Sequence, residues 1–306
     1  MKAVIWYFSG TGNTKRIAEE YARAFETENV EAEIKNIENA EGETDPSGCD
    51  FFGIAYPIYG FNAPNIVLAF AKRLVRQAKP IRTFVLKTSG EPLAMNNASS
   101  VKLKKILKKR GYVLTNEYHY VMPYNIIFRH SDEMANSMWA AAKSVIPVDC
   151  REILRGDEVK QKYPPFGGVA AGVLRIQQWG GKFNGRWYKV TDACVHCNRC
   201  IENCPAKNIS FKDGKFKFGN KCLMCMRCSL HCPKDAVKIG LFDKWRVNGA
   251  YSFTECIGEL KTPKVIGTDE KHRDFCRKAY DKYFAYCKEK AATQEFCESE
   301  SEAEAE

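Results

Sequence analysis

The feature that most constrains this chain is a pair of cysteine runs in its second half. Residues 194–210 read CVHCNRCIENCPAKNIS, and residues 222–240 read CLMCMRCSLHCPKDAVKIG. Each run contains C-x₂-C-x₂-C-x₃-C-P, and the second follows the first at an offset of 28 residues (222 − 194). The two runs hold 8 of the 14 cysteines. Because clustered cysteines in a reducing compartment bind metal more often than they pair as disulfides, the runs predict a metal-binding segment.

The cysteine spacing resembles that of small bacterial ferredoxins, in which two such runs hold two [4Fe-4S] clusters and each fourth cysteine crosses to the other cluster. This resemblance assigns to one cluster Cys194, Cys197, Cys200 and Cys232, and to the other Cys222, Cys225, Cys228 and Cys204. The alternatives are zinc sites or a disulfide knot, but zinc ribbons use paired C-x₂-C motifs without a crossing cysteine. His196 and His231 are interpreted as neighbours that tune the potential, since the cysteine set is complete.

A second motif lies at the N-terminus. An apolar run at 4–8 is followed by SGTGNT at 9–14 and by a helical pattern that begins near Asn13. Free backbone N–H groups and the helix dipole converge at such a helix start and form an anion site. A P-loop requires G-x₄-G-K-[ST], and a Rossmann loop requires a third glycine where this chain has Lys15. The interpretations that remain are an ordinary turn or a loop for one monophosphate, of the kind that FMN offers.

This loop resembles the FMN phosphate loop of flavodoxins, and two later loops occupy the places of the flavodoxin loops that grip the flavin ring. The resemblance implies that the phosphate is held by Ser9, Gly10, Thr11, Gly12, Asn13 and Thr14. It implies that the ring lies along Pro57, Ile58, Tyr59, Gly60 and Phe61, with its pyrimidine end near Ser89, Gly90 and Glu91. For Tyr59, stacking on the ring and packing in the core both stay open.

Strand and helix signals alternate over the first 155 residues. Strands are predicted at 4–8, 31–37, 51–56, 81–87 and 112–122, and helices at 14–27, 63–78, 101–110 and 132–154. Alternating units of this kind predict an α/β fold with a parallel sheet and helices on both faces. We expect a flavodoxin-like five-stranded sheet in the order 2-1-3-4-5, followed by an α+β ferredoxin domain with two clusters.

The pattern predicts four parts. They are a flavodoxin-like FMN domain at 1–155, a connector at 156–187, the ferredoxin domain at 188–240, and a C-terminal extension at 241–306 with a helix and an acidic tail. The connector is rich in glycine and proline, which favours a linker or ordered connector over a packed element, and its aromatic residues suggest that it docks on a neighbour. Residues 1–240 resemble the EFR-type flavodoxin–ferredoxin fusion family of mainly anaerobic microbes.

The charge of the chain indicates the kind of partner. The formal net charge is +10, but two clusters with their thiolates would remove about four charges and a bound phosphate about two. A mildly basic surface favours an acidic redox protein, such as a ferredoxin or an oxidoreductase, over nucleic acid. No apolar run is long enough to span a membrane or to form a signal peptide, so we expect a cytoplasmic protein. The C-terminal aromatic residues indicate either a cover for the ferredoxin domain or a homodimer contact.

FMN and two clusters in one chain predict electron transfer, because a flavin exchanges one or two electrons and each cluster exchanges one. The alternative is an enzyme whose flavin reduces a small substrate with electrons from the clusters. A redox sensor is a third alternative, but the chain has no DNA-binding motif. The sequence assigns no catalytic residue.

Overall fold

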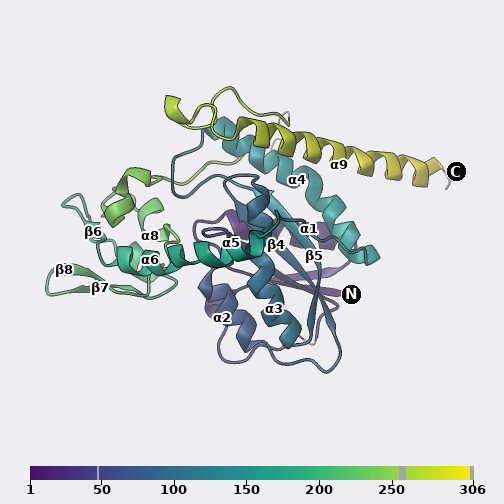
Figure 1. Ribbon diagram of the computed structural model, residues 1–306, viewed down its shortest axis with the longest axis horizontal. Coiled ribbons are helices and arrows are strands. Elements are labelled where there is room, and N and C mark those ends of the chain that lie inside the picture. Colours follow the sequence, from purple (N-terminus) through teal and green to yellow (C-terminus); the bar gives the residue numbers. More distant parts are fainter. Residues whose placement is uncertain (47, 255–259, 304–306) are drawn as a thin grey trace.

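The computed structural model of the protein describes residues 1–46, 48–254 and 260–303. Its N-terminal half is built on one parallel sheet in the order β2-β1-β3-β4-β5 (Figure 1). The prediction of a five-stranded flavodoxin-like sheet is therefore confirmed. The strands are β1 (Lys2–Tyr7), β2 (Glu31–Asn36), β3 (Phe51–Pro57), β4 (Ile81–Ser89) and β5 (Tyr112–Val121).

Helices cover both faces of this sheet, as expected for parallel strands joined by crossovers. On one face, α1 (Asn13–Thr27) and α4 (Asp132–Arg155) bury a core that includes Tyr21, Phe25 and Trp139. On the other face, α2 (Asn65–Arg73) and α3 (Val101–Lys109) bury Phe70 and Leu103. The 3-10 helices η1 (Ile37–Asn39) and η2 (Ala94–Ser100) lie in the connections.

Helix α2 is shorter than its sequence pattern predicts. The apolar periodicity suggests a helix to residue 78, but the helix ends at Arg73. Leu74 leaves the helical conformation, is fully buried, and forms a bridge with Thr44, whose carbonyl accepts a hydrogen bond from Val75 N–H at 2.9 Å. A tertiary pairing therefore competes successfully with local helix propensity at this point.

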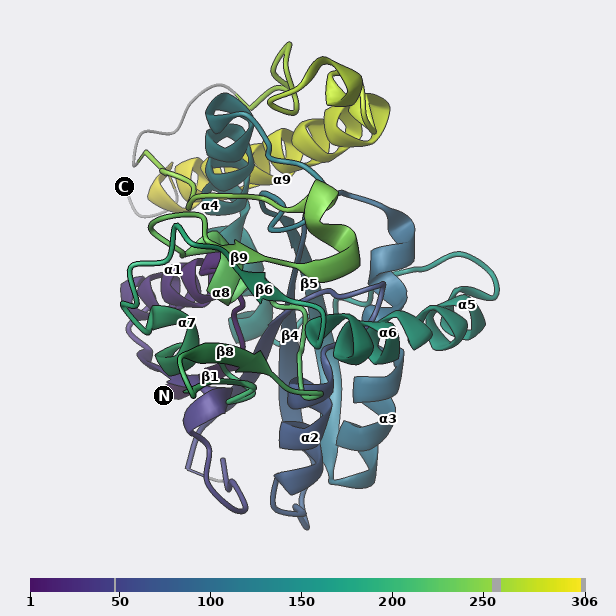
Figure 2. The ribbon, with the colours of Figure 1, turned by 90° about the vertical axis from the view of Figure 1, so that its left-hand side faces the viewer.

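Within the segment 156–187, where we expected a linker or an ordered connector, the structure has two helices. These are α5 (Gly167–Leu174) and α6 (Ile176–Gly185), which run almost end to end along one side of the molecule (Figure 2). The buried face of these helices consists of Gly167, Ala171, Gly181, Asn184 and Gly185. Small residues on this face let the helix backbone approach its neighbours closely. The glycines that suggested a linker serve packing instead.

The cysteine-rich part is a small α+β unit whose backbone repeats every 28 residues. It contains the antiparallel pairs β6 (Lys189–Val190) with β9 (Val237–Lys238) and β7 (Ile209–Lys212) with β8 (Lys215–Phe218). The one-turn helices α7 (Arg199–Glu202) and α8 (Arg227–Leu230) are related by the repeat offset. The left-handed backbone conformations of His196 and Asn198 recur at Met224 and Met226. The two halves thus share one local geometry.

The C-terminal extension completes the core of the N-terminal half. It contains η3 (Gly240–Trp245), η4 (Glu270–His272) and α9 (Arg277–Ala303), and α9 packs along α4 (Figure 1). Tyr280, Phe284 and Cys287 are buried in the same cluster as Tyr21. Lys290 forms ion pairs with the buried Asp149 and with Glu152. Within the described ranges, no helix combines the length and apolar character of a membrane span.

Candidate cofactor sites

A cavity of about 790 Å³ lies at the carboxyl ends of β1, β3, β4 and β5. Ligands of open parallel sheets bind at this edge, where the strand order reverses. Thirteen of the fourteen predicted flavin-binding residues line it: Ser9, Gly10, Thr11, Asn13, Thr14, Pro57, Ile58, Tyr59, Gly60, Phe61, Ser89, Gly90 and Glu91. Gly12 does not line the cavity, but it forms the N-cap of α1 in a left-handed conformation (φ 108°). The structure therefore brings the three predicted loops together.

The phosphate loop presents an uncapped helix N-terminus to the cavity. Gly12 has no side chain to cap α1, so N–H groups of the first turn stay available to an anion. Ser9 Oγ accepts a hydrogen bond from Gly12 N–H at 3.1 Å, which closes the turn. The Thr14 hydroxyl shares a hydrogen bond with the Thr88 hydroxyl at 2.8 Å, and Asn13 Nδ2 donates to the Pro123 carbonyl. These contacts tie the loop to the ends of β4 and β5.

The close packing of the loops depends on glycine at two positions. A Cβ at Gly10 would lie 2.6 Å from both the Cys225 carbonyl oxygen and the Tyr59 hydroxyl. A Cβ at Gly90 would lie 2.1 Å from the Tyr124 ring. The Tyr59 hydroxyl is buried and has no hydrogen-bond partner among the residues that the structure describes. A loop backbone without side chains over it, beside a buried hydroxyl that lacks a hydrogen-bond partner, is suited to binding a phosphate group.

A hydrogen-bond network shapes the loop after β4. Ser89 Oγ donates to the Glu91 carbonyl oxygen at 2.7 Å and contacts His119 Nε2 at 2.7 Å. Asn96 Nδ2 donates to both Ser89 Oγ and the Glu91 carbonyl oxygen. Burial raises the pKa of Glu91 and lowers the pKa of His119 to about 3. His119 is therefore a neutral ring that donates its Nε2–H to Ser89.

The C-terminal helix supports the same loop from behind. The Tyr280 hydroxyl donates to the Gly90 carbonyl oxygen and lies 3.2 Å from His130 Nε2. His130 Nδ1 accepts a hydrogen bond from Tyr124 N–H at 3.1 Å. Since the Tyr280 proton goes to Gly90, His130 Nε2–H is the donor to Tyr280. One tyrosine of α9 thus connects the loops that follow β4 and β5.

The cysteine-rich part closes the cavity on the opposite side. Leu223 and Met224, which lie between Cys222 and Cys225, line the cavity together with Gln177 and Gly181 of α6. Arg227 anchors this loop, because its Nε donates to the Gly10 carbonyl oxygen at 3.0 Å and its Nη2 to the Ser9 carbonyl oxygen at 2.6 Å. Arg227 also pairs with Glu38.

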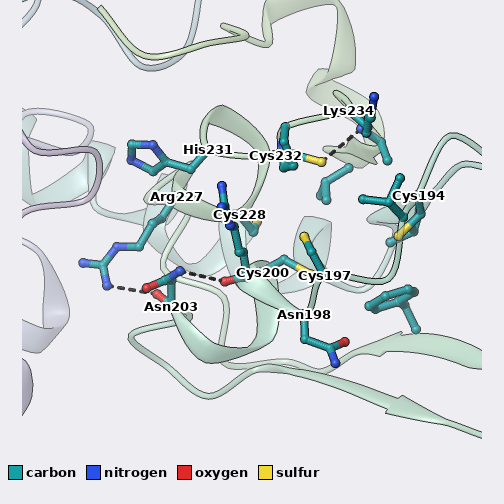
Figure 3. Close-up of a pocket in the computed structure, with 17 residues that line it drawn as sticks. Cys194, Cys197, Asn198, Cys200, Asn203, Arg227, Cys228, His231, Cys232 and Lys234 are labelled. Carbon is teal, nitrogen blue, oxygen red and sulfur yellow. Dashed lines mark hydrogen bonds between the residues drawn. The ribbon is translucent and has the colours of Figure 1, made fainter.

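The structure brings the eight cysteines of the runs near one another. Cys194, Cys197, Cys200 and Cys232 line one pocket, together with Cys228 (Figure 3). Cys204 lies near enough to the other three, Cys222, Cys225 and Cys228, to raise their pKa values, although burial is the larger cause. All eight are free thiols. Among the described residues no three His, Cys, Asp or Glu side chains are close enough for a single metal ion. The larger [4Fe-4S] cubane spaces its thiolates farther apart than one ion does.

Backbone N–H groups point at the cysteine sulfurs in a repeated pattern. His196 N–H donates to Cys194 Sγ at 3.4 Å, and its repeat counterpart Met224 donates to Cys222 Sγ at 3.4 Å. Asn208 and Ala236 donate in the same way to Cys204 and Cys232. N–H donors of this kind stabilise electron-rich sulfur and tune cluster potentials. These N–H groups point at the sulfurs because the donor residue or the residue directly before it has a left-handed backbone conformation.

Tyr188 adds a side-chain hydroxyl to one of the two sets. Its hydroxyl is buried and without a hydrogen-bond partner in the described part of the chain. Burial, together with the sulfurs of Cys222, Cys228 and Cys225, raises the pKa of Tyr188. A Cβ at Gly185 would lie 2.3 Å from Cys222 Cβ, so α6 is in direct contact with this cysteine.

Comparison with known proteins agrees with this architecture. Residues 193–237 match the protein family described as the 4Fe-4S dicluster domain. The sheet has the flavodoxin-like strand order, and the phosphate loop follows its first strand. The chain thus joins a sheet of flavodoxin-like strand order to a segment that matches the 4Fe-4S dicluster family.

Several solved flavodoxins are similar to the N-terminal half of this chain. A flavodoxin from Streptococcus pneumoniae TIGR4 is 16% identical, with a TM-score of 0.37, and the alignment covers 51% of this chain and 99% of that one. Flavodoxin 1 from Bacillus cereus is 15% identical at the same TM-score and coverage. A flavodoxin from the domain Archaea is 12% identical, with a TM-score of 0.30, over 57% of this chain and 99% of that one. A search of curated protein sequences finds no match to this chain.

Several residues of the flavin cavity escaped the sequence analysis. Those in the flavodoxin-like domain are Thr88, Asn96, Met122, Pro123, Tyr124, Ile126 and Ile127. Most of them follow strands whose ends were predicted. In the loop after the fifth strand the sequence offers Asn125 as a weaker candidate, and Asn125 also lines the cavity. The cavity residues that come from α6, from the cysteine runs and from η3 do not follow a predicted strand, so no sequence pattern marked them as part of this cavity. Of the cysteines outside the runs, Cys49, Cys150, Cys276 and Cys287 are free thiols, and Cys256 lies outside the described residues.

Proposed function

We propose that this chain is an electron-transfer protein that couples one FMN to two [4Fe-4S] clusters. One observation carries the proposal: a single cavity is lined by the phosphate and ring loops on one side and by Leu223 and Met224 on the other. Those two residues lie between Cys222 and Cys225, so the flavin site and one cluster site share a wall. FMN would exchange one or two electrons and each cluster one, which joins two-electron to one-electron chemistry.

In this proposal the phosphate loop, residues 9–14, binds the FMN phosphate. Residues 57–61 and 89–91 hold the flavin ring, and Tyr124 supports it through Gly90. The cluster ligands are Cys194, Cys197, Cys200 and Cys232 for one cluster, and Cys204, Cys222, Cys225 and Cys228 for the other. Helix α6 and Met224 cover the wall between the flavin site and the neighbouring cluster site and so keep water out of it. The four parts keep the boundaries 1–155, 156–187, 188–240 and 241–306, and membership of the EFR-type family stays a prediction.

The surface beside the first cluster site suits an acidic redox partner. Cys197 is exposed, and next to it lie the exposed Val195 and His196, the latter stacked against Phe216. The β7–β8 hairpin adds exposed lysines at Lys212, Lys215 and Lys217. An apolar centre with a basic rim favours weak, fast association with an acidic electron carrier.

Anaerobic purification tests the proposal directly. We expect about eight iron atoms per chain and one FMN. The Cys204→Ser variant should lose the electron paramagnetic resonance signal of the cluster nearest the flavin, whereas Cys49→Ser, a non-ligand control, should retain both signals. Iron close to zero, or FAD in place of FMN, would refute the cofactor assignment.

A second assay separates an electron carrier from a reductase. The exposed rings of Phe183, Trp187 and Trp245 at the cavity are the observation that favours a reductase, because flat substrates stack on aromatic rings. Reduced protein is offered quinones, nitro compounds or purified ferredoxin in steady state. Faster turnover of a small molecule than of ferredoxin would favour the reductase.

A further inference from the structure

Helices α5 and α6 carry their large apolar side chains on the outside of the molecule. The residues of this outer face recur at intervals of three or four, which is the spacing of one face of a helix. Together with the neighbouring η3 they form what we call the apolar face: Phe166, Val169, Val173, Ile176, Trp179, Phe183, Trp187, Leu241 and Trp245. The last four also line the cavity described above, whereas the first five lie away from it. Their exposed fractions lie between 52% for Trp245 and 85% for Phe166. Soluble domains rarely expose so many contiguous apolar residues unless a partner covers them.

The apolar face is continuous from α5 to η3. The two helices follow each other with only Arg175 between them, and that residue is itself helical. Asn184 Nδ2 donates to the Ile239 carbonyl oxygen at 2.9 Å, and Asn184 Oδ1 accepts from Leu241 N–H at 2.9 Å. These bonds hold η3 against the end of α6. The helical part alone, residues 167–185, is about 28 Å long.

The charges of the segment that carries α5 and α6 are all of one sign, whereas η3 carries Asp243, which pairs with Arg246, and Lys244. Between Glu158 and Asp192 the sequence contains six lysine or arginine residues and no aspartate or glutamate. Lys182 lies over the Trp179 ring at 5.0 Å, and Arg186 lies over the Phe183 ring at 5.8 Å. These two cations therefore lie among the aromatic rings of the face itself.

Helix α3 adds further positive charge beside the apolar face. A Cβ at Gly168 would lie 3.8 Å from Val101 at the start of α3, so the two helices adjoin there. The Arg175 charge lowers the pKa of the exposed Lys102, which shows that the two cations are close together. The occupant of this face should therefore be apolar at its centre and anionic at its edge.

We propose that the apolar face binds the surface of a membrane that contains anionic lipid. Interfacial helices combine tryptophan, phenylalanine and aliphatic side chains with flanking lysine and arginine, and they lie in the plane of the membrane. Each basic residue near an anionic surface adds to the attraction. Helix α5 projects from the body of the molecule as a ridge (Figure 2), which suits a flat surface better than a pocketed protein interface.

A second copy of the chain fits this face less well. A symmetric dimer places the same patch of both copies together, so the six cations of each segment between Glu158 and Asp192 would face six like charges, and the one carboxylate of η3, Asp243, is already paired with Arg246. Like charges brought together in this way oppose association. The binding proposed here goes beyond electron transfer and does not depend on it.

Vesicle sedimentation with the full-length holoprotein tests the proposal. We expect binding to vesicles of phosphatidylcholine with phosphatidylglycerol, release by high salt, and weak binding to phosphatidylcholine alone. The double variant Ile176→Ser/Trp179→Ser removes apolar area at positions that do not line the flavin cavity, and it should weaken binding about tenfold or more. Its matched control is Val113→Ser/Tyr286→Ser, which removes two exposed apolar side chains elsewhere and should bind like the wild type.

A charge-reversal pair completes the test. Lys182→Glu/Arg186→Glu should weaken binding to the anionic vesicles roughly tenfold or more, whereas Lys278→Glu/Lys282→Glu on α9 should not. Equal iron content, FMN content and melting temperature show that each variant is folded. If neither Ile176→Ser/Trp179→Ser nor Lys182→Glu/Arg186→Glu weakens binding to the anionic vesicles, the proposal is overturned. A dimer in solution, or a complex with an acidic protein, that requires Ile176 and Trp179 would also overturn it, because the face would then have another occupant.

Discussion

Arg227 donates a hydrogen bond from its Nε to the carbonyl oxygen of Gly10, 217 residues away in the sequence, at 3.0 Å. Gly10 belongs to the predicted phosphate loop, and Arg227 lies between two predicted cluster ligands. The same guanidinium donates to Ser9 and pairs with Glu38. One side chain therefore joins the flavin site to a cluster site and places a positive charge beside the phosphate loop.

Replacement of Arg227 tests this connection. Arg227→Gln removes charge-assisted hydrogen bonds that orient the loop carbonyls, and we expect roughly tenfold weaker FMN binding, since such bonds each contribute about 1.5–3 kcal/mol and are partly replaced by water. Fluorescence titration of flavin-depleted protein measures the dissociation constant. Arg199, the exposed counterpart of Arg227 in the first run, provides the control Arg199→Gln, which should bind FMN normally. Equal weakening in both variants would contradict the assignment.

The Tyr188 hydroxyl should set the potential of the cluster held by Cys222. Tyr188→Phe removes a donor beside the sulfur, and we expect a more negative potential, because the reduced cluster gains more from a hydrogen bond. The expected change is about 1 kcal/mol, on the order of 40 mV for a one-electron couple. A redox titration followed by electron paramagnetic resonance measures both clusters. The Cys194 cluster is the internal control, and a shift of that cluster alone would contradict the prediction.

The Tyr280 hydroxyl should stabilise the flavin-ring loop from α9. Tyr280→Phe leaves the Gly90 carbonyl and His130 Nε2 without their partner, so we expect a loss of about 1–3 kcal/mol in the free energy of unfolding together with weaker FMN binding. Urea unfolding and flavin titration measure the two effects. Tyr286→Phe removes an exposed hydroxyl from the same helix and should change neither. Normal FMN binding by Tyr280→Phe would show that the loop does not need α9.

The buried His130 should make stability depend on pH. Burial, with His272 nearby, lowers the pKa of His130 to about 3, whereas an unfolded histidine titrates near about 6.5. Between these values the unfolded chain binds a proton that the folded chain does not. The contribution of His130 to the free energy of unfolding is therefore fully present above about pH 6.5. It is lost on acidification, by up to about 1.4 kcal/mol per pH unit.

Unfolding at about pH 7 and about pH 5 measures this dependence. His130→Asn keeps an acceptor for the Tyr124 N–H but cannot be protonated, so its stability should fall less on acidification than that of the wild type. The buried His119 contributes in the same direction, and it stays in both proteins. An unchanged pH dependence in His130→Asn would show that the imidazole does not titrate on unfolding.

Local signals predicted most of the fold and failed where distant segments compete. The strands and helices of the first 155 residues follow from apolar periodicity, and their order from the parallel crossovers. Helix α2 ends early because Leu74 pairs with Thr44, a contact that periodicity does not contain. In the connector the choice between a linker and an ordered segment stayed open, because its glycines serve close packing against Cys222 and Met224, and composition alone does not distinguish packing from flexibility.

The sequence by itself determined the chemistry of the two sites. The cysteine spacing and the SGTGNT loop act through backbone conformation within a few residues, and such local geometry can be recognised without a fold. Only the tertiary structure decided that Arg227 meets Gly10, that Leu223 and Met224 close the flavin cavity, and that Tyr280 supports Gly90. The contacts of Arg227 with Gly10 and of Tyr280 with Gly90 join residues 217 and 190 positions apart. Such contacts depend on how whole elements pack, and no pattern along the chain records which side chains will then be neighbours.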